Sequence, residues 1–235
     1  MMAGEGRQLA FDLPHRPASG RDDFLVTPSN AKAVALIDLW PGWPSNTLIL
    51  LGPPGSGKSH LAAVWRETTG AALAGPSDIR ADAVPALLGK TALVIEDAPG
   101  AALEEPAFFH LLNLAREQKA HVLITALAPP AVWGIALPDL LSRLNAAPTA
   151  RLGAPDDALL RGVLVKLFAD RQIGVDEALV SYLVSRMPRE LAAARALVAE
   201  IDRRALEERA EVTRSFVGKV LGDIVSPGLF TGEEG

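Results

Sequence analysis

The residues best suited to chemistry in this sequence lie in one short glycine-rich stretch. An apolar run at 48–51 leads into Gly-Pro-Pro-Gly-Ser-Gly-Lys-Ser, and a helical pattern follows. Gly52, Gly57, Lys58 and Ser59 match every fixed position of the pattern G-x-x-x-x-G-K-[ST], in the strand–loop–helix context that the pattern requires. In such a loop, backbone N–H groups surround phosphate oxygens, the lysine reaches the β and γ phosphates, and the serine hydroxyl binds Mg²⁺. The stretch predicts a nucleoside phosphate site rather than an ordinary glycine-rich turn, with contacts from Pro53, Pro54, Gly55, Ser56, Gly57, Lys58, Ser59 and His60.

Two acidic residues follow another strongly apolar run. Residues 93–95 read Leu-Val-Ile, and Glu96 and Asp97 come directly after them. Open parallel sheets bind ligands at the carboxyl ends of their strands, where carboxylates can hold Mg²⁺ and position a water for nucleotide hydrolysis. We therefore expect Glu96 and Asp97 to be catalytic candidates, with Ser59 and Glu96 as the magnesium ligands. The alternative is a solvated acidic turn.

Two arginines are candidates for contact with phosphate. Arg143 lies beside the leucine stripe of a helix predicted over 137–144, so we expect its side chain to be exposed. It is either a solvated charge or an arginine finger directed at a phosphate held by a neighbouring subunit. Arg189 follows Pro188 at a predicted helix start, where the helix dipole disfavours a cation by about 0.3–1 kcal/mol. An anion opposite Arg189, such as the γ phosphate, would explain its position.

Strands and helices alternate over residues 24–154. Five apolar runs, at 48–51, 71–74, 92–95, 121–125 and 149–152, are expected to form strands with helices between them. This alternation predicts an α/β domain with a parallel five-stranded sheet covered on both faces. An apolar stripe of Val34, Leu36, Ile37 and Leu39 predicts a helix before the first strand, and Pro85 is expected to interrupt a helix over 78–88.

After Pro155 the pattern is helical. Amphipathic segments at 156–171, 176–187, 188–209 and from 213 predict a small all-α lid domain over 155–224, packed against the nucleotide domain. Residues 225–235 are expected to be a loose tail.

The first 23 residues are rich in glycine, proline and charge, and we expect an extended N-terminal tail. Within this tail lies a short apolar island that contains Gln8, Leu9, Phe11 and Leu13. From its chemistry alone, the island either packs on its own domain or docks in the apolar pocket of another protein.

Composition limits the remaining possibilities. The chain has 235 residues, a net charge of −5 and no cysteine, which excludes disulfides, thiolate zinc sites and thiol nucleophiles within it. The acidic balance argues against a broad nucleic-acid-binding face. We see no signal peptide, and the weakly polar stretch 120–138 is interrupted by Pro129, Pro130 and Gly134, so we expect no membrane span and a cytoplasmic protein.

With these pieces in order, the chain from Gln8 to about Gly222 resembles the AAA+ ATPases of bacterial replication initiation, and among them the short DnaA-related regulators of the Hda type. The resemblance covers the phosphate loop (Walker A), Leu-Val-Ile-Glu-Asp at 93–97 (Walker B), Leu-Pro-Asp-Leu-Leu-Ser-Arg-Leu at 137–144 and Pro-Arg-Glu-Leu at 188–191. By this resemblance Arg143 is the arginine finger and Arg189 the sensor 2 arginine. Residues 24–30 resemble the segment that lines the adenine side, which implies contacts from Phe24, Leu25 and Asn30. The apolar island resembles the peptide that binds the replicative sliding clamp.

Two positions depart from the family pattern. Glu96 stands where the family usually has an aspartate, one methylene shorter. Thr125 is the polar candidate for the sensor 1 region, and Leu127 stands where family members often carry an acid. Both departures weaken the positioning of a water and leave phosphate binding intact. We therefore expect a protein that holds ADP or ATP with Mg²⁺ and has weak or no ATPase activity of its own.

The resemblance implies a negative regulator of chromosomal replication initiation. Bound to the sliding clamp, it would present Arg143 to ATP held by the initiator DnaA and stimulate hydrolysis in trans. The alternative is an AAA+ motor or loader that uses its own ATP hydrolysis to remodel a replication partner. A homodimer is possible, and we expect no sequence-specific DNA-binding domain, because the sequence stops soon after the lid.

Overall fold

The structure is a computed structural model that describes residues 24–225, except residues 90 and 102. The predicted clamp-binding residues Gln8, Leu9, Phe11 and Leu13, with the rest of the tail 1–23, lie outside the described residues. Residues 226–235 of the predicted C-terminal tail also lie outside them.

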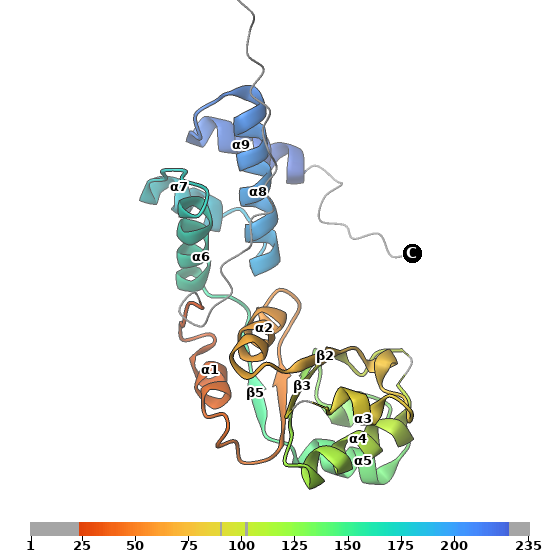
Figure 1. The fold of residues 1–235 in the computed structure, drawn as a ribbon. Coiled ribbons are helices and arrows are strands. Elements are labelled where there is room, and N and C mark those ends of the chain that lie inside the picture. Colours follow the sequence, from red (N-terminus) through yellow and green to blue (C-terminus); the bar gives the residue numbers. More distant parts are fainter. Residues whose placement is uncertain (1–23, 90, 102, 226–235) are drawn as a thin grey trace, which may run out of the picture.

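A single parallel sheet forms the centre of the first domain (Figure 1). Its strands are β1 (Thr47–Leu51), β2 (Ala72–Ala74), β3 (Ala92–Ala98), β4 (His121–Ala126) and β5 (Thr149–Arg151). Their order across the sheet is β2-β3-β4-β1-β5, and every neighbouring pair is parallel. The predicted parallel five-stranded sheet is confirmed. Because β1 lies between β4 and β5, the phosphate loop leaves the sheet near its middle, beside the end of β4.

Alternation along each strand gives the sheet two buried faces. Ile49 and Leu51 of β1 point to one face, and Leu48 and Leu50 point to the other. Helices α3 (Val84–Leu87), α4 (Glu105–Glu117) and α5 (Pro138–Ala146) pack on the first face. Helices α1 (Ala31–Asp38) and α2 (Lys58–Thr69) pack on the second (Figure 1). Both faces are therefore covered, as the apolar character of the strands predicts.

Four short elements differ from the sequence prediction. Leu39, expected in the apolar stripe of the first helix, is the residue that ends α1, and 55% of it is exposed. Pro85, expected to interrupt a helix, occupies the second position of α3. Backbone N–H groups in the first turn of a helix have no acceptor within the helix, so proline removes no hydrogen bond there. Two 3₁₀ turns, η2 (Pro76–Asp78) and η3 (Pro130–Val132), lie in loops after β2 and β4.

The second domain is a helical bundle with a core of its own. Its helices are α6 (Asp157–Ala169), α7 (Glu177–Val184), α8 (Leu191–Glu208) and α9 (Arg214–Val225). Phe168, Leu183, Ile201 and Val217 are among its fully buried side chains. Asp156 caps α6 by accepting a hydrogen bond from the N–H of Leu159 at 2.7 Å. The predicted all-α domain after Pro155 is present.

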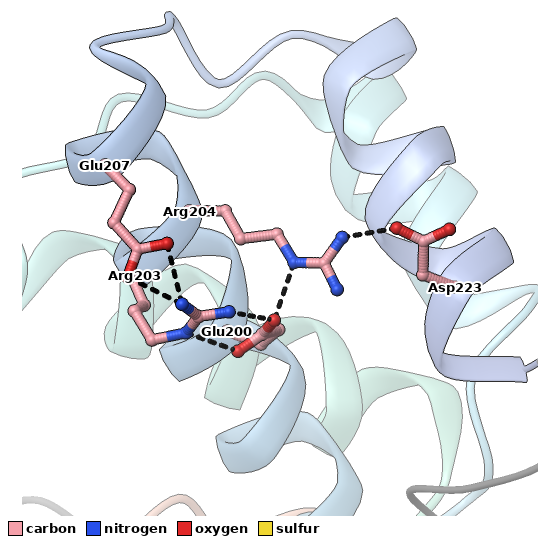
Figure 2. A network of polar contacts seen from close by, with 5 residues as sticks. All are labelled: Glu200, Arg203, Arg204, Glu207 and Asp223. Carbon is pink, nitrogen blue, oxygen red and sulfur yellow. Dashed lines mark hydrogen bonds and ion pairs between the residues drawn. The ribbon is translucent and has the colours of Figure 1, made fainter.

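A charged network joins α8 to α9 (Figure 2), at the end of the helical domain far from the sheet (Figure 1). Glu200 accepts hydrogen bonds from Arg203 and Arg204, and Arg204 also pairs with Asp223. Hydrogen bonds from Arg203 first, then Arg204, lower the pKa of Glu200 from 4.5 to about 2. The stability that Glu200 adds is therefore present above pH 4.5 and is lost as the pH falls toward 2. This network orders the lid without touching the phosphate loop.

Each helix in the described part of the chain is too short or too polar to cross a bilayer.

Candidate nucleotide site

The phosphate loop connects β1 to the first turn of α2. Gly55 and Gly57 have φ angles of +68° and +95°, a conformation that side chains with a Cβ rarely adopt. The helix begins at Lys58 directly after Gly57. A Cβ at Gly52 would lie 2.6 Å from Oγ of Ser56, whose hydroxyl is buried. The loop therefore depends on glycine at the positions that the sequence motif requires.

The lid lies directly on this loop. The N–H of Leu191, the first residue of α8, donates a hydrogen bond of 3.0 Å to the carbonyl of Gly55. A Cβ at Gly55 would lie 2.6 Å from Cβ of Glu190, and one at Gly57 would lie 3.0 Å from Cδ1 of Leu191. A ligand bound to the phosphate loop would therefore also lie against the first residues of α8.

Lys58 lies under the loop as a nearly buried cation. Only 6% of the residue is exposed, and its Nζ donates hydrogen bonds to the carbonyls of Gly52 at 2.8 Å and Pro53 at 3.0 Å. Burial lowers the pKa of the Lys58 ammonium below its ordinary value, against the attraction of Asp97. Phosphate oxygens would supply the anionic partner that neutral carbonyls do not.

The two acids lie at the end of β3, next to the loop. Burial first, then the charge of Asp97, raises the pKa of the Glu96 carboxyl, while a hydrogen bond with Ser59 opposes the rise. Glu96 therefore lies near Ser59, the other residue predicted to bind magnesium. Mg²⁺ commonly takes one or two side chains and completes its shell with phosphate and water, so this pair fits the ion when a nucleotide is bound. No preformed cluster of three or more acids and histidines occurs in the described chain.

Thr125 has a role that the sequence did not reveal. Ile95 pairs with Ile124 and Ala98 pairs with Ala126, so Glu96 and Asp97 form a bulge opposite Thr125. Asp97 has a φ of +57°, and its N–H donates a hydrogen bond of 3.0 Å to Oγ1 of the fully buried Thr125. The predicted sensor 1 residue therefore holds the backbone that carries the two acids.

Replacing Thr125 by valine is expected to destabilise the fold by about 1 kcal/mol or more, because the Asp97 N–H loses its acceptor while side-chain volume is kept. Affinity for Mg²⁺-nucleotide should fall as well, since the bulge is no longer held. Urea unfolding and calorimetric titration measure the two effects. Thr125→Ser is the matched control, because it keeps the hydroxyl and should retain the magnesium dependence. Equal magnesium dependence in Thr125→Val and the unsubstituted protein would contradict this role.

Two adjoining cavities form a cleft between the domains. The first, of about 400 Å³, is mostly apolar and includes Phe24, Leu25 and Asn30, which were predicted for the adenine side. The second, of about 460 Å³, includes Pro54, Gly55, Gly57, Lys58 and Asp97. Both are lined by Ser59, His60, Leu191 and Arg195. One cavity suits a nucleoside and the other its phosphates.

The adenine-side segment is built into both domains. The ring of Phe24 stacks on that of His60 at 5.3 Å and belongs to the sheet core, whereas Leu25 packs against the lid. Asn30 is buried, and its amide bonds to the carbonyl of Leu25 and the N–H of Thr27, so it shapes the segment. This segment therefore connects the sheet domain to the helical domain at the nucleoside cavity.

The two predicted arginines do not line this cleft. Arg189 was expected at a helix start, but α8 begins at Leu191, and the predicted start at 188 is wrong. The guanidinium of Arg189 pairs with Asp157 at 2.7 Å, with 59% and 54% of the two side chains exposed. Arg195 lines both cavities instead. Arg195 was not predicted from the sequence, although it is the one charged residue in the run Ala-Ala-Ala-Arg-Ala at 192–196.

Arg143 lies on α5 and is half-buried rather than exposed, so the predicted exposure is wrong. Its guanidinium lies 5.2 Å from the centre of the Phe109 ring on α4, because the two helices pack together. Glu105, one turn before Phe109, accepts hydrogen bonds from the N–H groups of Ala136 and Leu137 at the entry to α5. Two residues of α4 thus fix the position of the predicted finger.

No protein-family model matches this sequence, and no curated protein matches it. Among solved structures, domain III of the replication initiation protein DnaA from Thermotoga maritima has a TM-score of 0.76 at 19% identity, over 92% of this chain and 100% of that one. AMPPCP-bound DnaA from Aquifex aeolicus has a TM-score of 0.63 at 15% identity, over 82% and 70%. The Thermotoga maritima RuvB Holliday junction branch migration motor has a TM-score of 0.68 at 17% identity, over 89% and 73%. The chain has the AAA+ fold that these proteins share.

Proposed function

We propose that this chain is a nucleotide-binding regulator of bacterial chromosome replication, of the Hda type. Bound to the sliding clamp, it presents Arg143 to ATP held by DnaA and stimulates hydrolysis of that ATP, which inactivates the initiator. The likeness of its fold to DnaA supports a place in replication.

The observation that carries the proposal is the placement of Arg143. Its side chain lines neither cavity of the described cleft, so its own phosphate loop does not use it. Phe109 and Glu105 hold it and its helix in place. A positioned arginine outside its own site fits an arginine finger supplied in trans, which stabilises the charge that develops on a transferring phosphoryl group.

The cleft supports nucleotide binding more than turnover. Lys58, the loop glycines and Ser59 with Glu96 are suited to ADP or ATP with Mg²⁺. Leu127 lines the phosphate cavity where an acid could position water, and 60% of it is exposed. An apolar side chain at that place cannot orient the attacking water. The bound nucleotide therefore sets the shape of the protein, and chemistry occurs on the partner.

A second candidate is an AAA+ motor or loader that hydrolyses its own ATP. The pairing of Glu96 with Ser59 favours it, because these residues can hold the magnesium that hydrolysis needs. The ATPase rate of the isolated protein separates the two. Turnover above about 1 s⁻¹, an ordinary enzymatic rate, would favour the motor. Turnover far below that value, with tight nucleotide binding, supports the regulator.

Replacing Leu9 and Phe11 together by alanine is expected to remove clamp binding, because the apolar island then lacks the two large side chains that would fill the pocket of the clamp. The nucleotide affinity should not change. Surface plasmon resonance on immobilised clamp measures the first quantity and calorimetry the second. His15 and Arg16, both replaced by alanine, form the matched control in the same tail. Undiminished clamp binding by the Leu9 and Phe11 variant would show that this peptide has another role.

A further inference from the structure

The face of α8 that lies against the phosphate loop carries one cation. Leu191 and Arg195 are four residues apart and therefore share this face. Leu191 is fixed there by its N–H bond to the carbonyl of Gly55. Arg195 lies one turn further along α8 and lines both cavities, so it lies where they meet.

Arg195 and Arg189 carry the same charge but lie in different environments. Partial burial in the cleft lowers the pKa of the Arg195 guanidinium, and no carboxylate of the described chain contributes to that shift. Arg189 has a carboxylate partner, Asp157, in solvent outside both cavities. Among the described residues Arg195 has no ion-pair partner, although Lys166 and Asp170 also line the first cavity and Asp97 lines the second.

We propose that Arg195 is the lid residue that binds the nucleotide phosphates, in place of Arg189. This inference rests on the proposed binding of ADP or ATP. With the nucleoside in the first cavity and the terminal phosphate near Lys58, the α and β phosphates lie where the cavities meet. The planar guanidinium of Arg195 can donate two parallel hydrogen bonds to oxygens of one phosphate group.

This placement has a regulatory consequence. Because ADP and ATP share the α and β phosphates, Arg195 attracts the lid to either nucleotide equally. A sensor directed at the γ phosphate would release the lid on hydrolysis. Arg195 instead keeps the cleft closed in the ADP state, which suits a regulator that retains ADP while it acts on another molecule.

The test is calorimetric titration of the full-length protein with ADP, ATP and adenosine. For Arg195→Ala we expect the Kd of ADP and the Kd of ATP to rise equally, by about 10–100-fold, because charge-assisted hydrogen bonds are lost. The Kd of adenosine should stay unchanged. Arg189→Ala is the matched control, since it removes the same charge from the same segment. Its Kd values for ADP and ATP should stay within about threefold of those of the unsubstituted protein. The Kd values of Arg195→Lys should lie between those of the unsubstituted protein and those of Arg195→Ala, because lysine keeps the charge without the planar pair of donors.

Thermal unfolding without nucleotide verifies that each variant folds. Because the Arg195 side chain is exposed, we expect no large loss of stability when it is replaced. Three results would overturn the inference: unchanged ADP affinity in Arg195→Ala, a loss for ATP alone, or a loss in Arg189→Ala that exceeds the loss in Arg195→Ala. If the unsubstituted protein binds neither ADP nor ATP, the proposed nucleotide function itself fails. The two failures are therefore distinguishable.

Discussion

Arg143→Ala is expected to abolish stimulation of DnaA-bound ATP hydrolysis. An arginine finger supplied in trans contributes about 10³–10⁵ to the rate of phosphoryl transfer, so its removal should return hydrolysis to the rate of DnaA alone. Nucleotide binding by this chain should be unaffected, because Arg143 lines neither cavity of the cleft. A single-turnover assay with labelled ATP bound to DnaA measures the first effect, and calorimetry with ADP the second.

Arg116→Ala is the matched control for this variant. Arg116 lies on the exposed surface of α4, and its removal makes the same change in net charge. A second variant, Phe109→Leu, keeps Arg143 but removes the ring beneath its guanidinium, so stimulation should fall partly. If Arg143→Ala stimulates DnaA as well as the unsubstituted protein, Arg143 is not the finger.

Lys58→Met is expected to reduce the affinity for ADP and ATP by at least about 100-fold. The substitution removes the cation that reaches two phosphates and keeps most of the apolar stem. Stability without nucleotide should change little, because relief of the buried charge of Lys58 opposes the loss of its hydrogen bonds to the carbonyls of Gly52 and Pro53. Thermal unfolding with and without ADP measures both effects, since a ligand at 100 times its Kd stabilises a protein by about 2.7 kcal/mol.

Lys32→Met provides the comparison, because Lys32 is exposed on α1 and lines no described cavity. ADP should raise the melting temperature of the unsubstituted protein and of Lys32→Met equally. It should leave that of Lys58→Met unchanged. An ADP-induced shift of ordinary size in Lys58→Met would mean that the ligand binds elsewhere.

The sheet and the phosphate loop were predictable because their signals are local. Buried parallel strands are continuous apolar runs, and residues 48–51 and 93–95 show this pattern before any contact is known. The loop motif constrains backbone conformation within eight residues, so Gly57 and Lys58 could be assigned from their spacing. The pairing of Glu96 with Ser59 followed from the rule that carboxyl ends of parallel strands meet at one edge.

The details of the site that the sequence did not reveal depend on contacts between distant segments. Arg189 and Arg195 can be distinguished only when the lid is set on the loop, because Leu191 bonds to Gly55 more than 130 positions earlier. The role of Thr125 depends on the register of β3 against β4, which places it opposite the bulge. The support of Arg143 by Phe109 requires the packing of α4 on α5. No periodicity within one helix carries this information.

The most direct test of the account follows conversion of labelled ATP to ADP on DnaA in a single turnover. The reaction is compared with DnaA alone, with this protein, with clamp loaded on DNA, and with both together. We expect rapid hydrolysis when this protein and the loaded clamp are both present, and slow hydrolysis, close to that of DnaA alone, in the other three reactions. A rate with both components equal to that of DnaA alone would contradict the proposal that this chain acts on ATP held by the initiator.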